Sequence, residues 1–128
     1  FKTHLVKDAL KVVTDLYERG HRLIMLTNGF EEVQHLKMEK SGILSYFRTV
    51  TTSEEAGVKK PHSLIFEKAI SKGAGKPETS VMIGDNFDAD ILGGHQYGMK
   101  VIYLDSREGN SRTEHPSIQK LKQLRDYL

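Results

Sequence analysis

The spacing of the apolar residues constrains the fold of this chain most strongly. Short apolar segments that read as buried strands alternate with longer segments whose apolar residues recur at helical spacing. Strands separated by helices require right-handed crossovers, which produce a parallel, doubly wound sheet. We therefore predict an α/β fold of the three-layer, Rossmann-like class. The predicted strands are 22–26, 47–51, 80–83 and 101–104, and the predicted helices are 5–19, 30–40, one that opens near Pro61, 88–97 and a last one that carries Ile118, Leu121, Leu124 and Leu128.

Length and composition limit the functions that such a fold can have. The 128 residues contain no internal repeat or linker, so 1–128 is expected to form one domain. The net charge is +2 and the basic residues are spread along the chain, which argues against a nucleic-acid partner. No purely apolar run approaches the roughly 20 residues that a membrane span needs. The absence of cysteine excludes a disulfide framework and fits a cytoplasmic location.

Thr27, Asn28 and Gly29 follow the first predicted strand and precede a predicted helix. A hydroxyl and a run of backbone N–H groups at the start of a helix attract anions through free donors and the helix dipole. The alternative interpretation is an ordinary N-cap, because Thr and Asn are common in that position. The loop is therefore a candidate phosphate-binding segment.

Lys60 follows the second predicted strand and stands next to Pro61, at the start of the third predicted helix. A lysine ammonium is a compact charge that can neutralise a carboxylate nucleophile and a phosphoryl oxygen together. The alternative is a solvated surface lysine without a functional role. Taken alone, the sequence leaves both interpretations open.

The segment Gly84-Asp85-Asn86-Phe87-Asp88-Ala89-Asp90 leaves the third predicted strand with three carboxylates. Open α/β sheets place their binding sites at the carboxyl ends of the strands. Mg²⁺ is usually held by one or two carboxylates together with water and phosphate oxygens, so this loop is a candidate magnesium site. The alternative is helix capping by Asp85, Asn86 or Asp88. For Asp88, capping is the favoured role.

Taken together, the three loops resemble motifs of the haloacid dehalogenase superfamily of aspartate-nucleophile hydrolases. The resemblance covers nearly the whole chain. Leu26 to Gly29 resembles the second motif, Lys60-Pro61 the third, and Gly84-Asp85 with Asp90 the fourth. Residues 27–47 are more narrowly similar to nucleotidases that dephosphorylate pyrimidine nucleoside monophosphates.

This resemblance implies a phosphatase that acts on a small phosphorylated metabolite. Related dehalogenases carry serine where Asp85 stands, whereas a phosphate dianion that approaches a carboxylate needs a screening cation. Asp85 is therefore expected to bind Mg²⁺, and Asp90 to act as a second acidic group near the metal or as an orienting partner of Lys60. Lys60 and Thr27 are implied as catalytic groups. Substrate binding is assigned to Thr27, Asn28, Gly29 and Lys60.

The superfamily's first motif, a strand that ends in Asp-x-Asp and carries the nucleophile, has no counterpart in the chain, and the substrate-enclosing cap is also missing. The chain therefore resembles the C-terminal part of the hydrolase core and is expected to be inactive alone. In this fold the nucleophile strand lies in the middle of the sheet, so its omission should leave two strand groups with apolar edges. We expect the gap to be completed by an upstream segment, closed by direct pairing, or filled by exchange in a dimer.

Three other functions are compatible with parts of the pattern. A dehalogenase-type hydrolase is disfavoured by Asp85, for the reason given above. A receiver-like signalling domain also uses Mg²⁺, a hydroxyl and a lysine, but it places its acidic pair first, whereas Thr27 and Lys60 precede Asp85 here. A non-enzymatic relic or interaction domain would keep the fold without the nucleophile.

Overall fold

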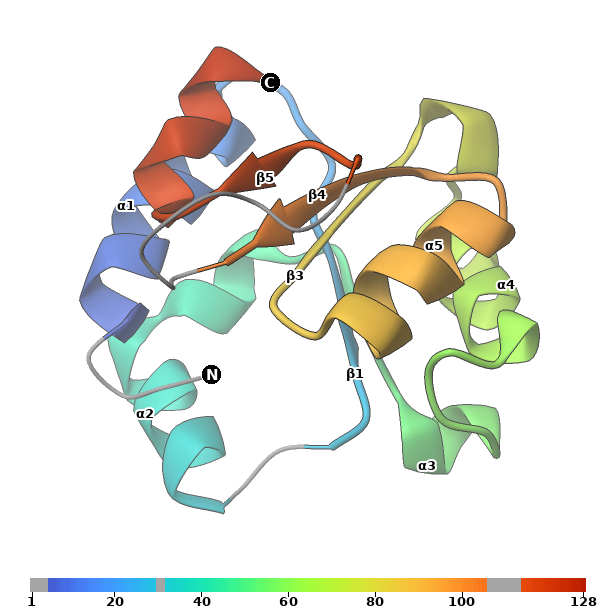
Figure 1. Cartoon of the computed structure of the whole chain (residues 1–128). Helices are drawn as coiled ribbons and strands as arrows, with labels where there is room; N and C mark the ends of the chain where they lie inside the picture. Colours follow the sequence, from blue (N-terminus) through green and yellow to red (C-terminus); the bar gives the residue numbers. More distant parts are fainter. Residues whose placement is uncertain (1–4, 30–31, 106–113) are drawn as a thin grey trace.

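The computed structural model describes residues 5–29, 32–105 and 114–128. Figure 1 shows helices around two groups of strands. Phe30, the expected start of the second helix, and most of the expected polar loop 105–116 lie outside the described residues. In chain order the helices are α1 (Leu5–Glu18), α2 (Glu32–Ser41), α3 (Ser53–Ala56), α4 (Ser63–Lys72) and α5 (Gly93–Gln96), and the strands are β1 (Ile24–Thr27), β2 (Thr49–Thr52), β3 (Val81–Gly84), β4 (Lys100–Leu104) and β5 (Ser117–Ile118). Tighter turns occupy η1 (Ile43–Tyr46), η2 (Pro77–Thr79) and η4 (Leu121–Asp126), and a π-helix occupies η3 (Phe87–Leu92).

The strands form two separate parallel sheets, which confirms the predicted parallel α/β class. One sheet has the order β1-β2, and the other has the order β3-β4-β5. Within the described residues no ladder joins β1 to β3, so the predicted gap is present and direct pairing does not close it. The two sheets therefore meet through side chains and loops.

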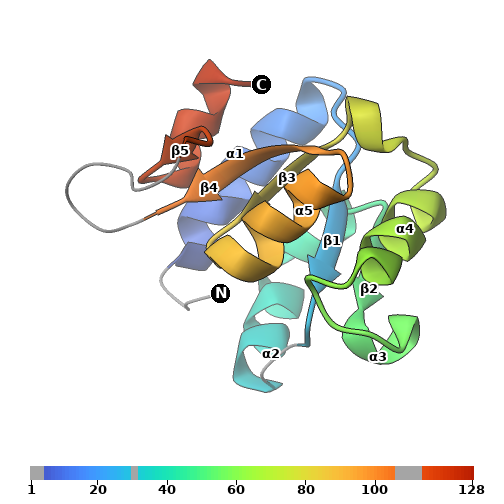
Figure 2. The same ribbon diagram turned by 45° about the vertical axis from the view of Figure 1, so that its right-hand side comes forward.

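Helices cover both sides of the strands, as Figures 1 and 2 show. On the side of α4 and α5, Phe66 and Ile91 pack with Val101 of β4. Its neighbour Ile102 points to the opposite side and packs with Leu16 of α1. Successive residues of a strand face opposite directions, and this alternation places β4 between two apolar layers. A third cluster of Ala9, Met38 and Ile43 joins α1 to α2 and η1.

The prediction that the last helix includes Ile118 is wrong, because Ile118 lies in strand β5. Tyr103 N donates to Pro116 O at 2.8 Å, and Asp105 N donates to Ile118 O at 2.8 Å. The free edge of β4 thus offers backbone partners to this segment, and the pairing overrides its helical spacing. The helical part is limited to η4, where Leu124 is buried.

Two helix starts lie within two residues of the predicted positions, and the structure shows which residues cap them. Helix α4 begins at Ser63, with His62 as its N-cap, because His62 Nδ1 accepts a hydrogen bond from Leu64 N at 3.1 Å. At the start of η3 the cap is Asn86, whose Oδ1 accepts from Ala89 N at 2.9 Å. Asp88 therefore lies in the first turn, and its predicted capping role is wrong.

The length and apolar character of a helix decide whether it can cross a membrane. Among the described residues, no helix combines the length and apolar character required to cross a bilayer.

Candidate active site

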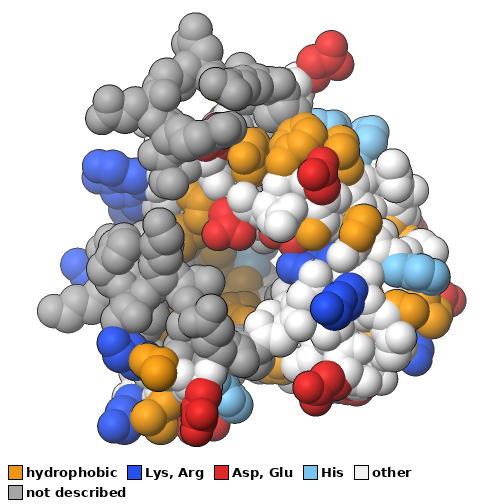
Figure 3. Space-filling view, turned by 60° about the horizontal axis from the view of Figure 1, so that its bottom comes forward, with side chains coloured by type: hydrophobic (Ala, Val, Ile, Leu, Met, Phe, Trp, Pro, Cys, Tyr) orange, Lys and Arg blue, Asp and Glu red, His pale blue; other side chains and the backbone are white. Residues whose placement is uncertain are grey.

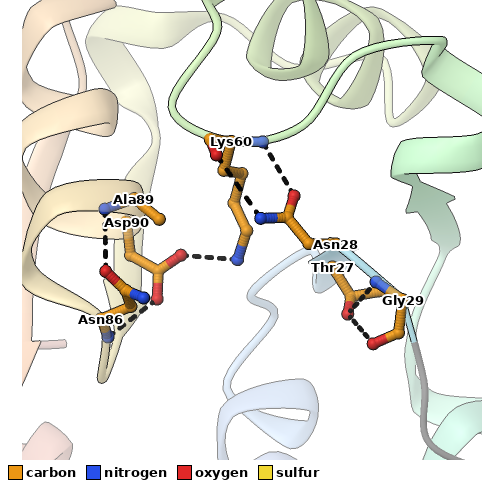
Figure 4. A network of polar contacts seen from close by, with 7 residues as sticks. All are labelled: Thr27, Asn28, Gly29, Lys60, Asn86, Ala89 and Asp90. Carbon is orange, nitrogen blue, oxygen red and sulfur yellow. Dashed lines mark hydrogen bonds and ion pairs between the residues drawn. The ribbon is translucent and has the colours of Figure 1, made fainter.

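The loops that follow β1, α3 and β3 meet at one edge of the molecule. This face is hollowed near its centre, with acidic and basic side chains around the hollow (Figure 3). Figure 4 shows the polar network that connects the three loops. Hydrogen bonds join Asn28 to Lys60, Lys60 to Asp90, and Asp90 to Asn86. Three segments that the sequence analysis selected separately are thus brought together.

The centre of the network is an ion pair between Lys60 and Asp90. Lys60 Nζ lies 2.5 Å from Asp90 Oδ1, and the side chains are only 12% and 5% exposed. A buried pair of this kind leaves an uncompensated charge when either partner is removed. The interpretation of Lys60 as a free, solvated surface lysine therefore does not hold.

Asp90 is fixed in place by the turn that precedes it. Its Oδ2 accepts a hydrogen bond from Asn86 N at 3.2 Å, so both carboxylate oxygens have partners. A side chain at position 84 would overlap the carboxyl group of Asp90, and only glycine leaves the room that this carboxylate occupies. Gly84 and Asn86 therefore set the direction in which Asp90 meets Lys60.

Asn28 holds the backbone of Lys60 on the opposite side of the network. Its Oδ1 accepts from Lys60 N at 2.8 Å, and its Nδ2 donates to Lys60 O at 3.4 Å. The main-chain oxygen of Asn28 accepts in turn from Ser53 Oγ at 2.9 Å. The ends of β1 and β2 are thereby tied to the loop that carries Lys60.

Thr27 and Gly29 form a local turn at the end of β1. Thr27 Oγ1 donates a hydrogen bond to Gly29 O at 2.9 Å. The same oxygen accepts a hydrogen bond from Gly29 N at 3.1 Å. Gly29 has φ 135, a conformation that favours glycine. Both residues lie beside Asn28, as Figure 4 shows. Their predicted contact with phosphate stays a prediction.

Asp85 and Asp88 are the exposed carboxylates of the acidic loop. Among the described residues, no hydrogen bond or ion pair engages Asp85, which directly follows β3. The described part of the chain also contains no group of three or more His, Cys, Asp or Glu side chains placed to hold a metal ion. Of the two predicted metal ligands, Asp85 has the chemistry and exposure that Mg²⁺ requires, whereas both oxygens of Asp90 are already engaged.

A small cleft of about 350 Å³ lies behind the Lys60 loop, between the start of α4 and α5, lined by Pro61, His62, Ser63, Gly93, Gln96 and Tyr97. The ring of Tyr97 stacks on Phe66 with centroids 6.1 Å apart. Burial raises the pKa of Tyr97 above 10.0, and the nearby charge of Glu67 raises it further.

Sequence reasoning missed the structural partners of the predicted site residues. Ser53 supports Asn28 although the two are 25 residues apart, and no local pattern signals their contact. Gly84 was recognised only as part of a motif, yet its missing side chain makes room for Asp90. Asn86 was named as one of three capping candidates, and its cap on Ala89 N is observed. Its backbone contact with Asp90 had no signal in the sequence.

Comparison with known proteins identifies the class to which this fold and site belong. The haloacid dehalogenase-like hydrolase family matches residues 2–104. The chain therefore belongs to this family, as its motifs predicted.

Curated relatives include several phosphatases. The chain is 40% identical over 101 residues to glyceraldehyde 3-phosphate phosphatase of Methanothermobacter thermautotrophicus, covering 79% of this chain and 45% of the relative. It is 40% identical over 91 residues to the pyrimidine 5′-nucleotidase YjjG of Escherichia coli, covering 69% of this chain and 40% of the relative. The chain thus spans less than half the length of these relatives.

Solved structures share the fold. A HAD phosphatase from Thermococcus onnurineus superposes with a TM-score of 0.83 at 27% identity, covering 92% of this chain and 55% of that one. The HAD hydrolase YfnB of Bacillus subtilis, bound to magnesium, gives 0.82 at 25% identity, covering 94% and 54%. The two separate sheets therefore belong to a HAD-like fold.

Proposed function

We propose that this chain supplies the phosphate-binding and metal-binding part of a Mg²⁺-dependent phosphatase that acts on small phosphomonoesters such as nucleoside monophosphates. The observation that carries the proposal is the network of Lys60, Asp90 and Asn28, which joins the carboxyl ends of strands from both sheets beside the exposed Asp85. The names of the phosphatase and nucleotidase relatives support the reaction and the substrate class. A cytoplasmic location fits a chain without cysteine.

Each proposed site residue has a chemical role. Mg²⁺ would be held in part by Asp85 and would screen the repulsion between a phosphate dianion and an attacking carboxylate. Lys60 presents a positive charge to the same oxygens, and Asp90 orients it. The Thr27 hydroxyl and the N–H groups of Asn28 and Gly29 would bind the remaining phosphate oxygens, with phosphate replacing the local contacts between Thr27 and Gly29. The attacking carboxylate is assigned to a segment outside these 128 residues.

Two observations favour phosphatase over dehalogenase chemistry, although a 2-haloacid dehalogenase of Pseudomonas syringae also shares the fold at 25% identity. Displacement of halide from carbon needs no metal, so an exposed carboxylate at position 85 would serve no purpose there. The relatives named above act on phosphate compounds by their names.

The metal site is tested by titrating the isotope-labelled chain with Mn²⁺, a paramagnetic substitute for Mg²⁺, and following the loss of amide NMR signals. Signals near residues 84–86 should broaden first in the native chain. Asp85→Asn should abolish this effect, while Asp88→Asn, a neighbouring exposed carboxylate, should preserve it. Equal broadening in the native chain and in Asp85→Asn would contradict the proposed ligand.

The reacting carboxylate is tested by incubating the chain with p-nitrophenyl phosphate and Mg²⁺. We expect no hydrolysis above that of Asp85→Asn, because the chain contains no apolar strand ending in Asp-x-Asp. Turnover that Asp85→Asn removes would show that the nucleophile lies within these 128 residues.

A further inference from the structure

We propose that Asn28 and Ser53 are positioning residues that act on phosphate through Lys60, so that the side chain of Asn28 is not itself a phosphate ligand. This inference rests on the proposed function, because it concerns how the lysine of that site is held. It assigns Asn28 a role that differs from direct substrate binding, and it gives Ser53 a role that no motif indicates.

The amide atoms of Asn28 match the polar groups of the Lys60 backbone. The backbone nitrogen of Lys60 can only donate and its carbonyl oxygen can only accept, so the two contacts fix the orientation of the Asn28 amide. Oδ1 is directed at Lys60 N at 2.8 Å, and Nδ2 is directed at Lys60 O at 3.4 Å. The side chain therefore clamps both polar groups of one residue located 32 positions further along the chain.

Lys60 is held at both ends, at its ammonium group and at its backbone. A lysine side chain has many rotamers, and a fixed ammonium group requires that both of its ends be held. Asp90 holds the ammonium end of Lys60 at 2.5 Å, and Asn28 holds the backbone end, as Figure 4 shows. Without Asn28, the ion pair would hold only the ammonium end of the Lys60 side chain.

Ser53 supports Asn28 from the end of β2. Ser53 is 9% exposed and begins α3, and its Oγ donates to the main-chain oxygen of Asn28 at 2.9 Å. The clamp is therefore attached to the ends of two paired strands. The chain of contacts Ser53–Asn28–Lys60–Asp90 passes from the β1-β2 sheet to the segment after β3, where no strand pairing joins the described parts of the two sheets.

Hydrogen exchange tests the clamp directly. In the NMR spectrum of the labelled chain, exchange of the Lys60 amide is measured against that of Phe66, a core residue that reports on global opening. Asn28→Ala should accelerate Lys60 exchange about tenfold relative to Phe66. Asn28→Asp keeps the acceptor for Lys60 N and should retain most of the protection, and Ser53→Ala should give an intermediate effect.

The matched control is Asn86→Ala. It is also an asparagine-to-alanine change, and Asn86 follows β3 in the other sheet as Asn28 follows β1. The Asn86 side chain caps η3 through Ala89 N, whereas its contact with Asp90 is made by the backbone N–H, which alanine keeps. Because Asn86 does not contact the Lys60 backbone, the relative exchange of Lys60 should change less than about twofold. Equal acceleration by Asn28→Ala and Asn86→Ala would overturn the clamp.

A double-mutant cycle separates positioning from direct contact. Binding of orthophosphate in the presence of Mg²⁺ is measured by calorimetry for the native chain, Asn28→Ala, Lys60→Met and the double variant. Asn28→Ala should weaken binding about fivefold when Lys60 is present, the size expected for the loss of one hydrogen-bonding role, and should have no further effect in Lys60→Met. An equal effect in both backgrounds would show that Asn28 contacts phosphate itself, which overturns the proposal.

The same binding measurements separate a failure of the proposed phosphatase function from a failure of the positioning role of Asn28. If the native chain and Lys60→Met bind orthophosphate equally, or neither binds it, the proposed function is contradicted. The exchange experiment then decides alone whether Asn28 positions Lys60.

Discussion

Lys60 and Asp90 form a buried ion pair at the centre of the candidate site. Two charged side chains that are almost completely buried face one another at 2.5 Å. The Asp90 carboxylate also accepts from Asn86 N, and the backbone of Lys60 is held by Asn28. The Lys60 ammonium and the Asp90 carboxylate are expensive to bury separately, so each needs the other. Their pairing is therefore a structural feature as well as a chemical one.

Replacing Lys60 by methionine should destabilise the chain by about 3 kcal/mol, because the carboxylate of Asp90 would remain buried without its counter-charge. The free energy of unfolding from urea titration measures the effect. Lys59→Met is the matched control, since Lys59 is exposed and adjacent, and its effect should stay within about 0.5 kcal/mol. Equal effects of the two changes would show that the ion pair contributes no stability.

Tyr97 should make stability depend on pH in the alkaline range. Burial, and secondly Glu67, raise the pKa of Tyr97 in the folded chain above 10.0. The unfolded chain then loses its proton first, so the stabilising contribution is complete below pH 10.0 and is lost as the pH rises through the folded pKa. Between pH 9 and pH 11, the free energy of unfolding should therefore fall less for Tyr97→Phe than for the native chain. An identical fall in both would contradict the assignment.

At the scale of elements, hydrophobic spacing predicted the parallel strands well and some helix boundaries poorly. Val101 and Ile102 read as one apolar run because β4 is covered on both sides, and such a run is typical of a parallel strand. Ile118 was assigned to a helix because its spacing to Leu121 and Leu124 is helical. The competing pairing with β4 depends on residues far away in the sequence, and local spacing carries no information about it.

Helix α1 should contribute strongly to stability, because it packs against both η4 and α2. Leu16→Ala should cost about 3 kcal/mol, since Leu16 is 4% exposed and contacts the layer that contains Ile102 and Ile118. Leu36→Ala in α2 removes the same atoms from a side chain that is 50% exposed and should cost much less. Thermal unfolding of both variants gives the comparison, and a similar loss in each would mean that α1 is not a core helix.

At the scale of the whole molecule, the sequence predicted which loops meet but not how they are joined. The order of Thr27, Lys60 and Asp85 after successive strands was sufficient to place them at one edge, because parallel strands present their carboxyl ends together. The clamp of Asn28 on Lys60 could not be foreseen, since nothing in either segment specifies a partner 32 residues away. The gap between the sheets was predictable from the missing motif alone.

The unpaired edges of β1 and β3 should make the isolated chain self-associate. Exposed edges offer backbone donors and acceptors to another chain, and no ladder within the described residues satisfies them across the gap. Light scattering coupled to size-exclusion chromatography over a range of concentrations should show dimers or larger species that dissociate on dilution. A monomer at every concentration would indicate that the gap is not an association site.

The central claim is that Asp85 holds a cation that creates a phosphate site beside Lys60. The affinity for orthophosphate, measured by calorimetry with and without Mg²⁺, tests it most directly. We expect Mg²⁺ to strengthen binding to the native chain and to Asp88→Asn, and to have no effect on Asp85→Asn. An affinity that is independent of Mg²⁺ in the native chain, or an equal response in Asp85→Asn, would contradict the claim.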